Sequence, residues 1–213
     1  MPGDAAAGDA AAVELAESVR RLMQSAVLTT VDDDTRRDVA AQIDDLTKHL
    51  SEQSRDTMPW PDPESMRRGH RPYSPVIGAA NPIAPPMTVR TLEDGSVVGE
   101  ATMRPIHEGP PAVVHGGWVA TLLDQLLGHA NAAAGVGGFT AELTVRYRRP
   151  TPYDVPLTVR ARTDSVDGRR VRASGEIVAD GVVTAEASGL FLMPSEERLA
   201  EVAQQYEDRR ASG

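Results

Sequence analysis

The segment from His115 to Ala133 constrains the fold more than any other part of this chain. A His-Gly-Gly sequence stands at the entrance of a long apolar stretch, and one carboxylate, Asp124, follows nine residues after His115. An isolated charge in an apolar helix is expensive to bury and is usually placed there for chemistry. Gly116 and Gly117 have no Cβ, so a ligand can approach the free N–H groups of the helix start. The segment therefore combines electrophilic donors with a candidate base.

Composition excludes several classes of function. The chain has 213 residues, no cysteine, five histidines and a formal net charge of -9. Disulfides, thiol nucleophiles and cysteine-ligated metals are excluded, and the histidines show no metal-ligand spacing. The acidic balance argues against nucleic-acid binding. Residues 1–12 do not resemble a signal peptide, and no stretch has transmembrane length. We expect one domain with an appendage, soluble and cytoplasmic, without metal, nucleic acid or membrane.

Residues 1–57 are predicted to form an N-terminal helical extension. The small, acidic tail Met1–Ala12 is expected to fray, and helices are expected at Val13–Leu28 and Asp34–Glu52. An apolar stripe on the second helix is predicted to pack against the body or a neighbouring subunit: Val39, Ile43, Leu46 and Leu50. Residues 58–86 are too rich in proline for a helix or central strand and are predicted to form an extended connector along the body.

Residues 87–193 carry the pattern of the main domain, and residues 194–213 that of a C-terminal tail with a short acidic helix. Asp-Gly pairs separate strand-like runs and favour hairpins. The predicted order is two strands, one helix and four strands: Met87–Thr91, Ser96–Met103, Gly117–Ala133, Thr140–Arg148, Pro156–Ser165, Arg170–Ala179 and Val182–Met193. In the run from Thr140, one alternating face is expected to cover the core: Ala141, Leu143, Val145 and Tyr147.

The single helix is apolar on nearly all sides and must therefore be surrounded. With about six strands available, the economical arrangement is a curved antiparallel sheet wrapped around it. The sequence thus predicts an α+β protein of hot-dog architecture, preceded by an extra helical region.

Three motifs resemble the hot-dog acyl-CoA thioesterases of the phenylacetate-degradation (PaaI-like) type. They are Glu-Gly-Pro-Pro-Ala-Val-Val-His-Gly-Gly at 108–117, Ala-Thr-Leu-Leu-Asp at 120–124, and Thr-Ala-Glu-Leu-Thr-Val-Arg-Tyr-Arg-Arg-Pro at 140–150. The resemblance covers roughly residues 87–193. The helices before residue 60 lie outside the family core.

The resemblance implies a mechanism that agrees with the residues themselves. The thioester carbonyl would bind to amides at the helix start, chiefly that of Gly117, and Asp124 would act as general base or as nucleophile. Thr140, sixteen residues beyond Asp124, matches the family position whose hydroxyl positions water or the carboxylate. In this family that residue usually comes from the partner subunit, across a dimer interface.

The chain departs from its relatives at one position. Several of them carry Asn or Gln six residues before the histidine, where this sequence has Gly109. Either Glu108 or a backbone group replaces that side chain, or the oxyanion arrangement differs. His115 is expected to position the loop rather than to transfer a proton.

Four further residues are candidates for contact with the substrate. Arg148 and Arg149 suit the phosphates of coenzyme A, Trp118 could line an acyl pocket, and Asn81 could reach the mouth of the site. Each also has a structural interpretation: a solvated strand face for the arginines, core packing for Trp118 and a turn for Asn81.

The leading hypothesis is hydrolysis of an acyl-CoA thioester to free acid and CoA, with no cofactor beyond the CoA of the substrate. A homodimer is the minimum assembly, because the wrap leaves open sheet edges, and a tetramer or hexamer stays open. Two alternatives remain. A hot-dog hydratase or dehydratase would pair an Asp with a later His, here His129, and a non-catalytic module would only bind acyl-CoA.

Overall fold

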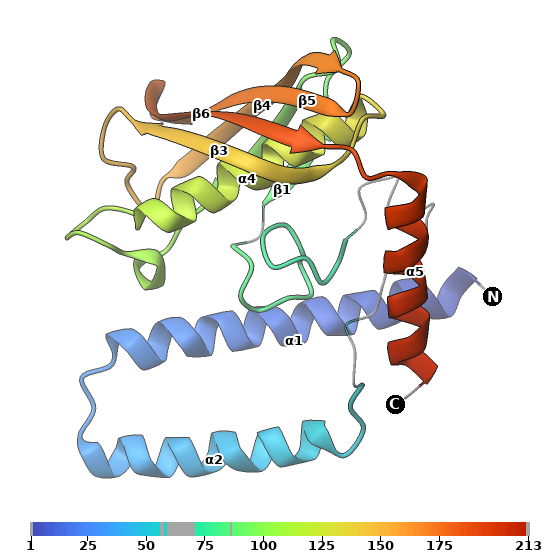
Figure 1. The fold of residues 1–213 in the computed structure, drawn as a ribbon. Helices are drawn as coiled ribbons and strands as arrows, with labels where there is room; N and C mark the ends of the chain where they lie inside the picture. Colours follow the sequence, from blue (N-terminus) through green and yellow to red (C-terminus); the bar gives the residue numbers. More distant parts are fainter. Residues whose placement is uncertain (1, 56–57, 59–70, 86, 212–213) are drawn as a thin grey trace.

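The computed structural model describes residues 2–55, 58, 71–85 and 87–211 (Figure 1). No helix in this described part is long and apolar enough to cross a membrane. The elements in chain order are α1 (Pro2–Leu28), α2 (Asp33–Ser51), β1 (Thr88–Thr91), β2 (Val97–Thr102), the 3-10 helix η1 (Pro105–His107), α4 (Gly116–Ala133), β3 (Phe139–Tyr147), β4 (Pro156–Asp167), β5 (Arg170–Ala179), β6 (Val182–Leu192) and α5 (Glu196–Ala211).

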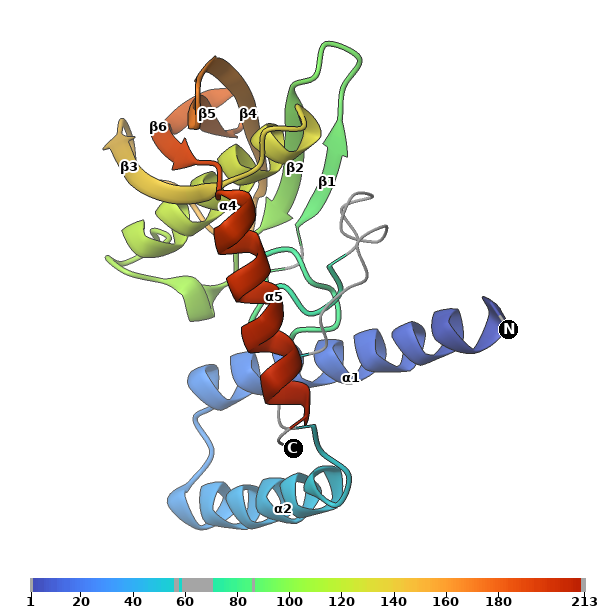
Figure 2. The same ribbon diagram turned by 45° about the vertical axis from the view of Figure 1, so that its right-hand side comes forward.

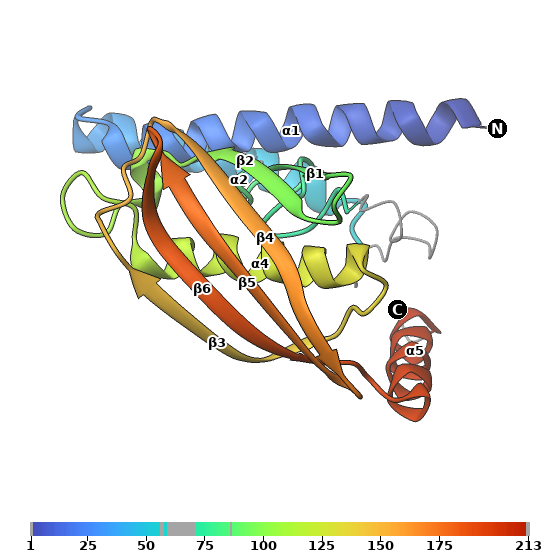
Figure 3. The same cartoon turned by 90° about the horizontal axis from the view of Figure 1, so that it is seen from above.

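The six strands form one antiparallel sheet in the order β1-β2-β4-β5-β6-β3. Figure 3 looks down on this sheet and shows α4 running beneath the strands. The predicted hot-dog architecture is confirmed. The Asp-Gly pairs lie in the hairpin turns, where Gly95 has φ 81° and Gly181 has φ 77°, backbone conformations that glycine adopts without strain. β1 and β3 are the two edges of the sheet.

The core lies between α4 and the sheet. Leu122, Leu123, Leu126 and Leu127 of α4 are at most 1% exposed and belong to one buried cluster with side chains of the sheet. Burying each such side chain contributes about 1.5–3 kcal/mol relative to exposure. The spacing i, i+1, i+4, i+5 turns all four leucines to one side of the helix. These contacts fix the apolar helix against the sheet.

Strand β3 covers less of the core than its alternating pattern predicts. Leu143 and Val145 pack against the core, but Ala141 and Tyr147 are exposed. The register of β3 against β6 shifts between Thr140 and Glu142, and no strand of the described residues pairs with the other side of β3. A bulge on an edge strand bends the strand away from the regular pleat, so its two ends lie outside the core.

The N-terminal tail is helical, which corrects the prediction that it frays. Helix α1 begins at Pro2, and alanine, the residue with the strongest helix propensity, fills much of its first three turns. Ala16 is buried, so α1 contacts the body of the protein in its middle.

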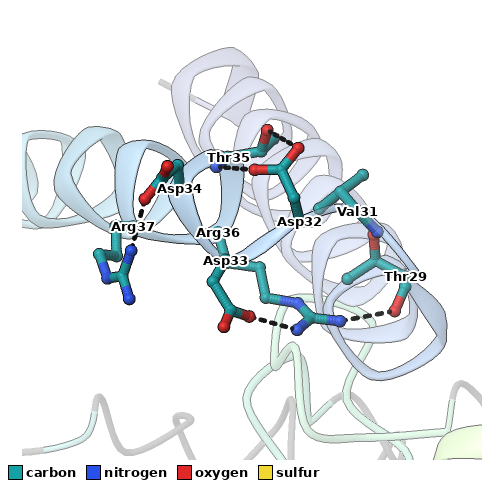
Figure 4. Close-up of polar contacts among 8 residues, drawn as sticks. All are labelled: Thr29, Val31, Asp32, Asp33, Asp34, Thr35, Arg36 and Arg37. Carbon is teal, nitrogen blue, oxygen red and sulfur yellow. Dashed lines mark hydrogen bonds and ion pairs between the residues drawn. The ribbon is translucent and has the colours of Figure 1, made fainter.

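Helix α2 stands apart from the core. Asp32 caps it: its Oδ1 accepts a hydrogen bond of 2.8 Å from the Thr35 N–H (Figure 4). None of the residues of α2 is buried, and Leu46 and Leu50 of the predicted stripe are 63% and 56% exposed. The prediction that this stripe packs against the body is wrong; packing against a neighbouring subunit stays a prediction.

The described part of the proline-rich segment, residues 71–85, is a series of tight turns and not an extended connector. Its prolines and Gly78 favour turns, and Asn81 closes one of them by accepting a hydrogen bond from the Ile83 N–H. Val76 joins the core cluster and Ala84 is 1% exposed, so the segment does lie against the body as expected. Residues 59–70 lie outside the described part.

The C-terminal residues form the expected helix, α5, which leaves the sheet after β6 and points away from it (Figure 2). The division into an extension, a connector, a main domain and a tail stays an interpretation.

Candidate active site

The His-Gly-Gly sequence forms the start of α4. His115 is the N-cap, and its Nδ1 accepts a hydrogen bond of 3.0 Å from the Gly117 N–H. The amide predicted to bind the thioester carbonyl is therefore held by the imidazole. His115 is exposed, so its side chain has room to turn away and free that amide. The Gly116 N–H has no acceptor among the described residues.

Asp124 and Thr140 meet at the open side of α4. The Thr140 hydroxyl donates a hydrogen bond of 2.9 Å to Asp124 Oδ1. Asp124 is half-buried and Thr140 is exposed, which corrects the expectation of a buried, unpaired carboxylate. The physical reason is that β3 is an edge of the sheet, so within the described part of the chain no further strand lies beyond it to cover the carboxylate.

The hydroxyl comes from the same chain as the carboxylate. The family resemblance led us to expect it from a partner subunit. The link between Ala133 and Phe139 is short, and it turns the chain back so that β3 begins alongside α4. Asp124 and Thr140 thus form a pair within a single protomer.

His107 is part of the site and was missed by sequence reasoning. Its carbonyl oxygen accepts the His115 N–H at 2.8 Å, and its Nδ1 accepts the Arg104 N–H at 2.9 Å. The side chain is nearly buried at 6% exposure, and burial lowers the pKa of the imidazole. His107 thereby holds the loop before α4. No spacing in the sequence marks it, because its role depends on the fold of that loop.

Trp118 contacts this histidine edge-on. The two ring centroids are 4.9 Å apart and the rings are nearly perpendicular, at 87°. Trp118 is half-buried and packs against the core cluster. These contacts fit the interpretation of Trp118 as a packing residue.

Gly109 leaves no room for a side chain such as the Asn or Gln that the resemblance implies in several relatives. A Cβ at this position would lie 2.8 Å from His115 Cα, a distance that requires the backbone to shift. Glu108 forms an isolated β-bridge with Val114, and hydrogen bonding to Glu108 raises the pKa of the Tyr153 phenol. The loop is therefore closed by backbone pairing around Gly109.

The remaining predicted substrate-contacting residues lie apart from the Asp124–Thr140 pair or already form hydrogen bonds with other groups. Arg148 donates two hydrogen bonds of 2.7 and 2.8 Å to Glu186, so its charge is paired. The Arg149 side chain is exposed and has no partner among the described residues. The Asn81 side chain is occupied in its own turn, where it also donates to the Tyr73 carbonyl at 3.0 Å.

His129, the residue that a hydratase would pair with Asp124, is not bonded to it. Within the described part of the chain, no hydrogen bond or ion pair joins the two. His129 is half-buried, and burial together with the nearby charge of Arg71 lowers the pKa of its imidazole. The Asp–His arrangement of the hydratase alternative is absent from these residues.

A solved structure described as a thioesterase superfamily protein shares both fold and sequence with this chain. The two are 36% identical with a TM-score of 0.78, and the match covers 85% of this chain and 94% of the other. The chain belongs to the thioesterase superfamily. The family model of that description matches residues 112–186, which contain α4, Asp124 and Thr140.

Curated relatives of this superfamily member match over a shorter region. Acyl-coenzyme A thioesterase THEM4 of Xenopus laevis is 34% identical over 90 residues, and THEM4 of Bos taurus is 30% identical over 96 residues. These matches cover 41% and 44% of this chain but only 40% and 39% of the relatives, so the chain spans about two fifths of their length. A phenylacetic acid degradation-related protein of Ralstonia eutropha JMP134 shares the fold at 23% identity and a TM-score of 0.53, over 61% of this chain and 98% of the other.

Proposed function

We propose that this protein hydrolyses acyl-CoA thioesters to free acid and CoA. The observation that carries the proposal is the hydrogen-bonded pair of Asp124 and Thr140 beside a helix that starts with a His-Gly-Gly cap. Relatives named acyl-coenzyme A thioesterase support the choice of substrate class.

The start of α4 supplies the electrophilic half of the mechanism. The thioester carbonyl oxygen accepts hydrogen bonds from the amides of Gly117 and Gly116, at the positive end of the helix dipole. His115 must first release the Gly117 N–H, which it holds at 3.0 Å. The developing oxyanion is then stabilised by donors that belong to the backbone and need no proton transfer.

Asp124 supplies the nucleophilic half. As a general base, its carboxylate takes a proton from water; the hydroxide attacks the carbonyl carbon, the C–S bond breaks, and the thiolate leaves and takes up a proton. As a nucleophile, the carboxylate itself attacks, the thiolate leaves, and water opens the mixed anhydride. In both routes Thr140 holds Oδ1, which leaves Oδ2 free to face the substrate.

A homodimer is part of the proposal. β3 is an open edge, and Phe139 and Tyr147 at its two ends are 58% and 57% exposed. A second subunit along β3 would cover the open side of the Asp124–Thr140 pair and shield it from bulk solvent, with room for the water that the hydrolysis consumes. Light scattering at micromolar concentration tests this directly; a monomer would contradict the dimer. The cytoplasmic location stays a prediction.

The decisive experiment is release of free thiol from a panel of acyl-CoA esters. We expect Asp124→Asn to lower kcat by at least about a hundredfold while circular dichroism stays unchanged. Asp45→Asn is the matched control, because Asp45 is a carboxylate on α2 that is 78% exposed. A variant Asp124→Asn within a few-fold of wild type would refute the assigned role. Binding of CoA without turnover of any ester would favour the non-catalytic module.

A further inference from the structure

Tyr147, the last residue of β3, reaches the first turn of α4. Its hydroxyl donates a hydrogen bond of 2.9 Å to the Gly116 carbonyl oxygen. That oxygen belongs to the same peptide unit as the Gly117 N–H, the amide that binds the thioester carbonyl in the proposed mechanism. A side chain from a separate element is therefore bonded to the far end of the candidate oxyanion donor.

Two side chains hold this peptide unit from opposite ends. His115 Nδ1 accepts the Gly117 N–H at 3.0 Å, and the Tyr147 hydroxyl donates to the Gly116 carbonyl at 2.9 Å. A peptide unit is planar, so a group that fixes the carbonyl also fixes the direction of the N–H. His115 must leave before the thioester oxygen can take its place. Tyr147 bonds the other end, so it can hold the amide in position during that exchange.

The Tyr147 bond also makes the Gly117 amide a stronger donor. A hydrogen bond to a peptide carbonyl draws electron density from the nitrogen toward the oxygen, so the N–H becomes more positive. Hydrogen bonds in such a chain strengthen one another by about 10–30% each. An oxyanion is a better acceptor than the neutral carbonyl of the substrate, so the gain is larger in the transition state than in the ground state.

Gly116 permits the close approach of the tyrosine. A Cβ at this position would lie 3.3 Å from the phenolic oxygen of Tyr147 and 3.4 Å from the nearest ring carbons. These distances are shorter than ordinary van der Waals contacts, so a larger residue would push the ring away by a few tenths of an ångström. The first glycine of the His-Gly-Gly cap thus makes room for a side chain of the protein itself.

Tyr147 is anchored by β6 and not by burial. Its side chain is 57% exposed, whereas its backbone pairs with Ala185. The next residue, Arg148, donates its N–H to the Thr184 carbonyl at 2.8 Å, and its side chain bonds Glu186. Catalytic geometry must be held within about 0.5 Å, and a donor on a fixed strand meets that need better than one on a loop. Core packing therefore does not account for a tyrosine here, and the bond to Gly116 does.

We propose, given the proposed thioester hydrolysis, that Tyr147 is a positioning residue of the active site. It orients and polarises the Gly116–Gly117 peptide, so that the Gly117 N–H stabilises the developing oxyanion. At the other end of the same strand, Thr140 bonds Asp124. β3 is thereby coupled to both halves of the mechanism, the oxyanion donor and the base.

Removal of the hydroxyl separates this role from a purely structural one. Tyr147→Phe should lower kcat for acyl-CoA hydrolysis about tenfold, while KM changes by less than about twofold. The effect should be smaller than the loss of about 100- to 1,000-fold that follows removal of a whole oxyanion donor. A tyrosine that only stabilised the fold would lower the urea midpoint of unfolding and leave the kcat of the folded protein unchanged.

Tyr73→Phe is the matched control. It removes the same atom from a tyrosine whose hydrogen bond to Asn81 uses the backbone carbonyl, and it should leave kcat unchanged. Light scattering on both variants checks that their assembly is equal, because β3 is the edge where the dimer is expected.

Nuclear magnetic resonance reports on the contact itself, independently of turnover. The Gly116 carbonyl carbon and the Gly117 amide nitrogen share one peptide bond. Both resonances should move upfield in Tyr147→Phe, because the peptide unit loses a hydrogen bond at its oxygen. Tyr73→Phe should leave both in place. Unchanged resonances in Tyr147→Phe would overturn the positioning role.

Asp124→Asn, measured in parallel, distinguishes a failure of the positioning role from a failure of the proposed function. Lost turnover in Asp124→Asn together with wild-type kcat in Tyr147→Phe would overturn the role of Tyr147 and leave hydrolysis standing. A rise in KM without a fall in kcat would also overturn that role. A wild-type protein that hydrolyses no ester would overturn both. A lower kcat, a steady KM and shifted Gly116 and Gly117 resonances are the expected result.

Discussion

The Thr140 hydroxyl donates a 2.9 Å hydrogen bond to Asp124 Oδ1 and so joins the start of β3 to the middle of α4. This bond fixes the orientation of the carboxylate and leaves its second oxygen free. It also ties the candidate base to the sheet edge where a partner subunit is expected. Both effects require a hydroxyl at position 140.

Replacing Thr140 by valine should therefore lower kcat for thioester hydrolysis by about tenfold or more, because the carboxylate loses its orienting donor. Thr140→Ser keeps the hydroxyl and should retain most of the activity. Steady-state thiol release measures both variants. Equal activity of the valine and serine variants would remove Thr140 from the mechanism.

Glycine at position 109 is predicted to be required by space. Gly109→Ala places a Cβ 2.8 Å from His115 Cα, so it should lower the free energy of unfolding and displace the cap of α4. Gly128→Ala is the matched comparison, since its Cβ would meet Phe191 at an ordinary 3.8 Å. Alanine inside a helix stabilises it by up to about 1 kcal/mol relative to glycine. Urea unfolding should show changes of opposite sign; equal changes would contradict this account.

Stability should fall as the pH drops below about 6.5, the ordinary pKa of histidine. Burial lowers the pKa of His107 in the folded state, so below 6.5 the unfolded chain binds protons that the folded chain does not. The loss continues until the pH reaches the lowered folded value and then levels off. His129 adds to the effect in the same direction.

Urea unfolding at pH 8 and pH 5.5 measures this dependence. His107→Asn keeps an acceptor for the Arg104 N–H and should reduce the difference between the two pH values. His49→Asn, at an exposed position on α2, should leave that difference unchanged. A difference that His107→Asn does not alter would show that this histidine carries none of the pH dependence.

A buried pair of hydroxyls holds the loop after β3. Thr151 donates a 2.9 Å hydrogen bond to Thr184, and both side chains are 3% exposed. Thr184→Val leaves the Thr151 hydroxyl without this acceptor and should cost about 1–3 kcal/mol of unfolding free energy. The double variant with Thr151→Val should recover part of that loss, as a thermodynamic cycle from urea unfolding would show. Strict additivity of the two substitutions would argue against a direct coupling.

Sequence patterns predicted the fold well because the signals are local and repeated. The four leucines of α4 fall on one side at helical spacing, and the Asp-Gly pairs mark the hairpin turns. Such features depend on residues close together in the chain. The order of the elements then left the sheet with few ways to cover the helix.

Predictions that required knowledge of neighbours were less accurate. The burial of β3 was overestimated because its edge position and its bulge depend on pairing with β6. The stripe on α2 is predicted to pack against the body or a neighbouring subunit, but α2 buries no residue within this chain. The amount of surface that an amphipathic element buries depends on where its neighbours lie, and periodicity alone carries no such information.

The candidate site likewise has features that follow from the sequence and features that depend on the fold. The sequence by itself determined the chemical groups: a histidine cap, two glycine amides, a carboxylate in an apolar helix and a threonine at the start of the next strand. Only the tertiary structure decided three contacts. Thr140 meets Asp124 within one chain, His107 holds the loop before α4, and the His115 imidazole accepts a hydrogen bond from the Gly117 N–H. Spacing along a helix or strand follows from local backbone geometry, whereas contacts between separate elements depend on how the whole chain packs.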